Sequence, residues 1–238
     1  MPEFLKKPFR WLYHLWNINL EKNLIRDLMD YFSIDRKKVM HLLKSGGDLS
    51  ADMWRATNPK TEDAIKHFYQ ENPFYVFNLI FWHATREQRA LRLQMLDLAK
   101  GKVLDFGGAV GDMSAMAADK NLEVDYADLP GRTFDFAAWF FKKRGYQIAM
   151  IDLSREEISK NYDTIFCIDV IEHTTNPKDI LKSFVDHLNI NGQLMITELI
   201  PTIHEGVPFH FEMGFDGRKY LESLGMVKGD KPYLWIKH

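Results

Sequence analysis

The feature that most constrains the fold is an apolar stretch, Val103–Phe106, that leads into a glycine-rich turn. Gly107, Gly108 and Gly111 lie in this turn, and the small residues Ser114–Ala118 follow it. Glycine adopts positive φ and leaves room for another molecule beside the backbone. A helix that begins after such a turn presents its free N–H groups at the same place. The stretch therefore predicts a strand, a turn that approaches a ligand, and a helix.

A second apolar run strengthens this interpretation. Glu123–Asp128 ends in an acid 17 residues after Gly111. In a βαβ unit, an acid at this place accepts hydrogen bonds from ribose hydroxyls. The sequence therefore predicts a nucleotide-cofactor site with Asp128 as its ribose ligand, and an exposed turn acid before Pro130 is the alternative.

The rest of the chain alternates in the way that a doubly wound parallel sheet requires. Strands are predicted at 102–107, 123–128, 147–152, 162–169 and 193–198, and helices at 112–120, 133–144 and 177–188. After a helix at 218–224, two short apolar runs at 226–229 and 233–237 predict an antiparallel hairpin. The fold class is therefore α/β.

Five stretches resemble, in order and spacing, the class I S-adenosylmethionine (SAM)-dependent methyltransferases: Val103–Asp112, Asp128, Tyr146–Leu153, Asp163–His173 and Gly192–Glu198. The most specific of them ends at Asp169-Val170-Ile171-Glu172-His173 and is followed by Asn176-Pro177. The resemblance runs from about Gly101 to the C-terminus. It implies SAM as cofactor and a seven-stranded Rossmann-like methyltransferase sheet with an N-terminal helical extension. One departure is Ala109, which stands where the family most often has glycine and predicts a tighter cofactor site.

Ligands of open α/β sheets lie beyond the carboxyl ends of the strands. The resemblance implies that Asp152 and Leu153 hold the adenine and that Asp169 and Val170 line the methionine end, near the transferred methyl. A helix cap ahead of Ser154-Arg155-Glu156-Glu157 is the alternative role of Asp152. The expected cofactor-binding residues are Asp105, Gly107, Gly108, Ala109, Gly111, Asp128, Leu129, Asp152, Leu153, Asp169 and Val170.

A methyl group on a sulfonium is already a good electrophile, so the protein has to align it and, for a hydroxyl acceptor, to remove a proton. His173 and His210 are the catalytic candidates, with His204 in the same segment as His210. A structural hydrogen bond is the alternative role of His173. Asp169, Glu172 and His173 also resemble the magnesium-binding element of some quinone and RNA-end O-methyltransferases, with His204 or His210 completing the set. Hard cations prefer oxygen ligands, so no metal ligand is assigned.

The first hundred residues are expected to form a helical lid and substrate region, and 101–238 the SAM-binding domain. Helical spacing predicts three short helices within 4–43, a flexible joint at Ser45–Asp48, and further helices at 51–57, 61–71, 74–83 and 85–100. Aromatic residues gather at Phe68, Tyr69, Phe74, Tyr75, Phe77, Phe81 and Trp82. They form core or pocket wall, and Tyr69 or Tyr75 is a candidate to reach the cofactor carboxylate.

Charge and composition narrow the partners. The net charge is −2, from 31 basic and 33 acidic residues, which disfavours nucleic acid as a partner. A single cysteine, Cys167, fits a reducing cytoplasm. The longest apolar run, 74–82, is too short for stable membrane insertion. The mildly basic N-terminal helices predict a solvated face, with contact to a membrane or a homodimer as the alternatives.

The leading hypothesis is a SAM-dependent methyltransferase for a small or medium-sized, partly apolar acceptor, with pocket walls from 68–82 and 207–215. Methylation at O, N or C stays open. The alternatives are a catalytically silent SAM-fold binding module and a nicotinamide-dependent oxidoreductase.

Overall fold

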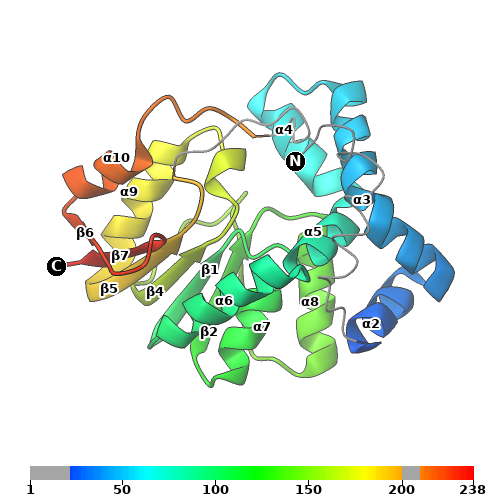
Figure 1. Ribbon diagram of the computed structural model, residues 1–238, viewed down its shortest axis with the longest axis horizontal. Helices are drawn as coiled ribbons and strands as arrows, with labels where there is room; N and C mark the ends of the chain where they lie inside the picture. Colours follow the sequence, from blue (N-terminus) through cyan, green and yellow to red (C-terminus); the bar gives the residue numbers. More distant parts are fainter. Residues whose placement is uncertain (1–21, 200–209) are drawn as a thin grey trace, which may run out of the picture.

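A computed structural model of the 238-residue chain describes residues 22–199 and 210–238. Within these residues, seven strands form one sheet in the order β3-β2-β1-β4-β5-β7-β6 (Figure 1). The strands are β1 (Lys102–Phe106), β2 (Glu123–Asp128), β3 (Ala149–Asp152), β4 (Tyr162–Cys167), β5 (Leu188–Ile196), β6 (Met226–Lys228) and β7 (Leu234–Lys237). β1 to β5 pair with one another in parallel, and β7 is antiparallel to β5 and β6. The predicted α/β sheet with its terminal hairpin is confirmed.

Helices cover both faces of the sheet, because successive strand residues point to opposite sides. Val103 faces a core formed with α6 (Arg86–Leu98) and α7 (Asp112–Asp119), and α8 (Arg132–Arg144) packs through Phe141 against Tyr126. Leu104 faces the opposite core, with α9 (Pro177–His187) and α10 (Gly217–Ser223). Pro177 opens α9 at a first-turn position, where its missing N–H costs nothing.

Four more helices precede the sheet: α2 (Lys22–Phe32), α3 (Arg36–Thr57), α4 (Glu62–Glu71) and α5 (Tyr75–His83). The side chains of Asp35, Thr61 and Thr85 accept hydrogen bonds at the starts of α3, α4 and α6. Leu28, Leu43 and Phe77 form a buried cluster with Phe136 of α8. The N-terminal helices therefore share a core with the sheet domain.

A buried ion-pair group fastens α2 to the end of α8. Asp27, 2% exposed, lies 2.8 Å from Lys143 Nζ and also pairs with Arg144. This contact fixes the position of the first described helix.

The predicted flexible joint at Ser45–Asp48 is wrong, because α3 continues through it without a break. A Cβ on Gly46 would lie 3.1 Å from the backbone nitrogen of Asn78 and 3.2 Å from the carbonyl oxygen of Phe74. Glycine here lets α3 and α5 approach closely. The helix predicted at 51–57 is the last part of α3, and the first helix predicted within 4–43 lies outside the described residues.

Most strand ends differ from the prediction by one or two residues, and the differences at β4 and β5 have identifiable structural features. β4 stops at Cys167, because Asp169 has a φ of 56° and turns the chain out of the sheet. β5 starts earlier than predicted, at Leu188, with a register shift against β4 between Tyr162 and Thr164. In residues 22–199 and 210–238, no helix combines the length and apolar content that crossing a membrane requires.

Candidate functional site

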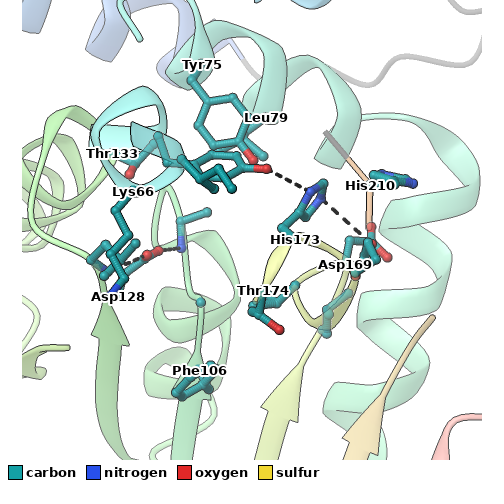
Figure 2. A pocket seen from close by; sticks show the side chains of 18 of the residues that line it. Lys66, Tyr75, Leu79, Phe106, Asp128, Thr133, Asp169, His173, Thr174 and His210 are labelled. Carbon is teal, nitrogen blue, oxygen red and sulfur yellow. Dashed lines mark hydrogen bonds and ion pairs between the residues drawn. The ribbon is translucent and has the colours of Figure 1, made fainter. Parts of the chain in front are cut away.

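A cavity of about 1920 Å³ lies between the carboxyl ends of the strands and the helices α3, α4 and α5. In Figure 2, Tyr75 and Leu79 of α5 lie on one side of it, and Asp128 and Asp169 lie on the other. Nine residues predicted for the cofactor or for catalysis line it: Gly107, Ala109, Asp128, Leu129, Leu153, Asp169, Val170, His173 and His210. The structure therefore brings most of the predicted site together.

Ala109 holds the glycine-rich turn in an unusual conformation, with a φ of 49°. Its N–H donates to Asp128 Oδ2 at 2.7 Å, and its carbonyl oxygen accepts the Tyr126 hydroxyl at 2.7 Å. A left-handed alanine costs about 1–2 kcal/mol. The two hydrogen bonds offset this strain, so the alanine keeps the turn in place.

The three glycines of the turn are required mainly by packing within the protein. An added Cβ would lie 2.5 Å from Val170 Cγ2 at Gly107, 2.6 Å from the Tyr126 ring at Gly108, and 2.5 Å from the Phe141 ring at Gly111. Only Gly107 of the three lines the large cavity. Direct contact of Gly108 and Gly111 with the cofactor therefore stays a prediction that the cavity does not support.

Asp105 also lies behind the cavity wall. Its Oδ2 accepts the Ser114 hydroxyl at 2.6 Å, which ties β1 to α7. Burial raises the pKa of Asp105 to about 7. Asp105 therefore stabilises the glycine-rich turn by joining the strand before it to the helix after it.

Asp128 lies at the end of β2, half-buried, so it is not an exposed turn acid. Its Oδ1 accepts the Leu129 N–H at 2.7 Å, and its Oδ2 accepts that of Ala109. Burial raises its pKa to about 6 against these hydrogen bonds. Each carboxylate oxygen has two acceptor positions, so Asp128 still has capacity for hydroxyl donors from the cavity.

Asp152 caps a turn and not the helix considered from the sequence, because the chain after β3 forms a turn at 153–155. Its Oδ1 accepts the Ser154 N–H at 2.9 Å and the Ser154 hydroxyl at 2.6 Å. The Ser154 hydroxyl beside it holds the pKa of Asp152 below its usual value. Leu153 lines the cavity, whereas Asp152 caps the turn behind it; adenine binding by Asp152 stays a prediction.

Asp169 is fixed from two sides. Its Oδ2 accepts the Trp82 Nε1–H of α5 at 2.9 Å, and its Oδ1 accepts the Thr197 hydroxyl at 2.9 Å. The side chain therefore joins the end of β4 to an N-terminal helix at the cavity.

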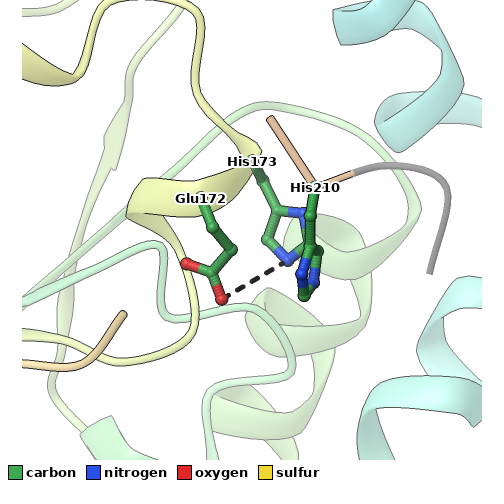
Figure 3. Close-up of side chains that lie close together, drawn as sticks. All are labelled: Glu172, His173 and His210. Atoms are coloured by element: carbon green, nitrogen blue, oxygen red, sulfur yellow. Dashed lines mark ion pairs between the residues drawn. The ribbon is translucent and has the colours of Figure 1, made fainter. Parts of the chain in front are cut away.

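His173 lies between a tyrosine and a second histidine. The Tyr69 hydroxyl is 3.1 Å from Nδ1, and the ring centroid of His210 is 4.7 Å from that of His173. Nε2 is 3.9 Å from Glu172 Oε1 (Figure 3). Burial, together with the nearby carboxylates of Asp169 and Glu198, raises the pKa of Glu172 to about 9.

Glu172, His173 and His210 offer one nitrogen or oxygen each within 4.8 Å of one another, which is close enough for a shared cation. Asp169 is not part of this group, so the metal element considered from the sequence has a different composition in the structure. His204 lies outside the described residues.

Sequence reasoning missed a polar contact directly behind the glycine-rich turn. His83 Nδ1 at the end of α5 is 2.8 Å from Asp112 Oδ1 in the first turn of α7, and buried Arg92 Nε is 3.9 Å from Asp112 Oδ2. Although burial acts to raise it, His83 and Arg92 hold the pKa of Asp112 well below its usual range. No local pattern signals this pair, because His83 and Asp112 are 29 residues apart.

Comparisons with known proteins agree that this chain is similar to methyltransferases. A family model described as a methyltransferase domain matches residues 81–217. A ubiquinone biosynthesis O-methyltransferase of Rickettsia canadensis is 28% identical over 105 residues, which are 43% of this chain and 44% of that protein. The protein of the same name from Xanthomonas euvesicatoria is 26% identical over 193 residues, 74% of this chain and 78% of that protein. This chain thus spans less than half the length of the Rickettsia relative.

Two solved structures share the fold. The [4+2]-cyclase SpnF superposes with a TM-score of 0.52 at 12% identity, covering 61% of each chain. A Haemonchus contortus phospholethanolamine N-methyltransferase 2, solved with phosphomonomethylethanolamine and S-adenosylhomocysteine, gives 0.50 at 18% identity and covers 58% of this chain and 37% of that protein. At these identities the likeness concerns the fold alone.

Proposed function

The chain belongs to the class I SAM-dependent methyltransferase family, and from this premise we propose that it transfers the methyl group of SAM to a hydroxyl oxygen of a small or medium-sized, partly apolar acceptor. The observation that carries the proposal is the position of His173, inside the cavity and just beyond the end of β4. A hydroxyl acceptor needs a base at this place, because its proton must leave as the new bond forms.

The residues at the cavity fit SAM. Asp128 has spare acceptor capacity for the two ribose hydroxyls, and Leu129 and Leu153 offer apolar surface for the adenine. Gly107 and Asp169 lie toward the methionine end, where a side chain at 107 would already collide with Val170. Bound SAM supplies a methyl group on a positively charged sulfur, which is a good leaving group.

His173 is the proposed base. In the tautomer whose Nδ1–H donates to the Tyr69 oxygen, Nε2 carries a lone pair that accepts the hydroxyl proton. Tyr69 then orients the ring and fixes the tautomer, as the partner of a catalytic histidine does in other enzymes. His210, in contact with His173, is the second candidate.

Tyr69, Tyr75, Phe81 and Trp82 line the cavity and offer apolar surface for the acceptor. Trp54, Phe68 and Phe211 pack with Tyr69 in a cluster behind this lining. Residues of the wall predicted at 68–82 thus support the proposal; of the wall predicted at 207–215, His210 lines the cavity, and 207–209 lie outside the described residues. The Rickettsia and Xanthomonas relatives are named O-methyltransferases, which supports oxygen as the methylated atom.

The fold alone does not establish methyl transfer, since the superposed SpnF is named a cyclase. The test is therefore calorimetry with S-adenosylhomocysteine, followed by transfer of labelled methyl from SAM to a panel of phenols and amines. We expect His173→Gln to keep the cofactor affinity and to lower the transfer rate by about 10²–10⁴-fold. His41→Gln on the exposed face of α3 is the matched control.

Three results would count against the proposal. Failure of the wild type to bind S-adenosylhomocysteine would remove the cofactor assignment. Binding without transfer to any acceptor would favour a silent binding module. Transfer to amines alone, at a rate that His173→Gln leaves unchanged, would refute a hydroxyl acceptor and its base.

A further inference from the structure

The part of the cavity beyond β4, formed by Asp169, Val170, Glu172 and His173, is rich in carboxyl groups; we name it the methyl end. Glu198, which follows β5, lines the cavity as well. The Lys and Arg side chains that line the described part of the cavity, Lys44, Arg55 and Lys66, come from α3 and α4. Figure 2 shows Lys66 beside Asp128, away from Asp169 and His173. The lysine and arginine side chains thus lie on the helical side of the cavity, and the methyl end contributes carboxyl groups.

Two of these cations already have carboxylate partners at the mouth. Arg55 Nη1 lies 2.8 Å from Asp52 Oδ1, and Lys66 Nζ lies 2.7 Å from Glu62 Oε1. They therefore contribute little positive charge to the methyl end.

Glu172 is the central group of the methyl end. Its side chain is 2% exposed, and its Oε2 atom has no hydrogen-bond partner among residues 22–199 and 210–238. Within the same residues, neither Glu172 nor Asp169 forms an ion pair with Lys or Arg. A buried acceptor atom without a donor is unfavourable, so a ligand that brings a donor would be stabilised here.

The pKa values of two side chains near Glu172 are affected by the same carboxyl groups. Burial raises the pKa of Tyr75, and the carboxylates of Asp128, Glu172 and Asp169 raise it further. Burial likewise raises the pKa of Cys167, and the carboxylates of Glu172 and Asp169 add to the effect. Tyr75 and Cys167, which belong to different elements, are therefore both close to the carboxyl groups of the methyl end.

We propose that the methyl end binds a protonated amine on the acceptor, whose N–H donates to Glu172 Oε2 beside the hydroxyl that is methylated. This inference rests on the proposed function and narrows its substrate class to amine-bearing hydroxyl compounds. The pKa of Glu172 is raised to about 9 when no cation is beside it, and an ammonium at this place favours its ionised form. A carboxylate or phosphate at the same place would keep Glu172 protonated and would face the carboxylate of Asp169, so an anion loses the attraction and meets a like charge. The positive charge on the amine therefore distinguishes such acceptors from anionic compounds.

The test uses the full chain saturated with S-adenosylhomocysteine and three probes that share a phenol ring: tyramine, with an ammonium; tyrosol, which is neutral; and 4-hydroxyphenylacetate, an anion. Dissociation constants are measured by ligand-observed NMR at pH 7. We expect tyramine to bind at least about tenfold more tightly than 4-hydroxyphenylacetate, with tyrosol between them. Glu172→Gln should reduce this preference to less than about threefold, because it removes the carboxylate and keeps the shape.

Glu62→Gln is the matched control, since Glu62 lines the cavity mouth and pairs with Lys66. It should leave the tyramine preference unchanged. Equal affinities for the three probes, tighter binding of the anion, no binding of any probe, or an unchanged preference in Glu172→Gln would overturn the inference. Failure to bind S-adenosylhomocysteine in the first step would instead overturn the proposed function.

Discussion

Gly46 and Gly47 of α3 provide a direct test of how the N-terminal helices are joined to the rest of the chain. Both lie inside a continuous helix, where alanine is more favourable than glycine by about 1 kcal/mol. If they formed a hinge, alanine at either position would stiffen the helix and stabilise it equally. The structure predicts instead that alanine at position 46 and alanine at position 47 change the stability in opposite directions.

At position 46 the new methyl group would meet backbone atoms. Its Cβ would lie 3.1 Å from Asn78 N and 3.2 Å from Phe74 O, and neither atom can move without shifting α5. Overpacking of this kind costs about 1–3 kcal/mol, which exceeds the gain in helix propensity. At position 47 the short contact is 2.9 Å to Asn78 Oδ1, the end of a side chain that can rotate away.

Gly46→Ala should therefore destabilise the protein by about 1 kcal/mol, and Gly47→Ala should stabilise it by about 0.5–1 kcal/mol. Urea unfolding gives the free-energy difference directly. Thermal unfolding should place the two variants about 3–6 °C apart, given the usual response of a domain of this size. If Gly46→Ala were as stable as Gly47→Ala, the close approach of α3 and α5 would not be the reason for the glycine.

Three further predictions concern carboxyl groups. Asp128→Ala should weaken S-adenosylhomocysteine binding by about 1.5–3 kcal/mol, the usual value of hydrogen bonds to a charged group, and equal affinities by calorimetry would remove Asp128 from the site. Asp27→Ala should lower the free energy of unfolding by about 2 kcal/mol, because it leaves Lys143 and Arg144 without their shared partner; unchanged urea unfolding would contradict this. Burial raises the pKa of Asp105 from 3.8 to about 7, so this carboxyl stays protonated to a higher pH in the folded state than in the unfolded state. The free energy of unfolding therefore falls as the pH rises from about 4 to about 7. Asp105→Asn should gain up to roughly 4 kcal/mol relative to wild type between pH 4 and pH 8, and parallel stability curves would exclude that shift.

The central fold was predictable because its signals are local. The apolar run of β1, the glycine-rich turn and the acid at the end of β2 follow one another in the chain, and Pro177 marks the start of α9. The continuous helix at Ser45–Asp48 was not predictable, because glycine in a helix allows either bending or close packing. Only the neighbouring helix, 28 or more residues away in the sequence, decides between the two at Gly46.

The candidate site was predictable to the extent that strand ends determine it. Asp128, Asp169 and Val170 line the cavity because parallel strands place their carboxyl ends at one edge. The Tyr69 contact to His173 joins residues 104 positions apart, and no local pattern specifies it. The packing role of Gly111 was hidden for the same reason, since Phe141 of α8 creates the need for it.

The contacts of α4 and α5 with three separate segments that follow β1, β2 and β4 bear on how the cavity opens. His83 bonds to Asp112 after β1, Glu71 O accepts the Arg132 Nε–H after β2 at 2.9 Å, and Trp82 donates to Asp169 after β4.

A rigid lid that swung away would have to break all three contacts and separate Leu28 and Leu43 from Phe136. Buried apolar contact is the main stabilising term in a fold, so such a movement is costly, and the N-terminal helices should contribute to cofactor affinity and not to acceptor binding alone. Movement that admits the acceptor is therefore expected at side chains of the mouth such as Trp82, which is 43% exposed, and not by rotation of α3 about Gly46.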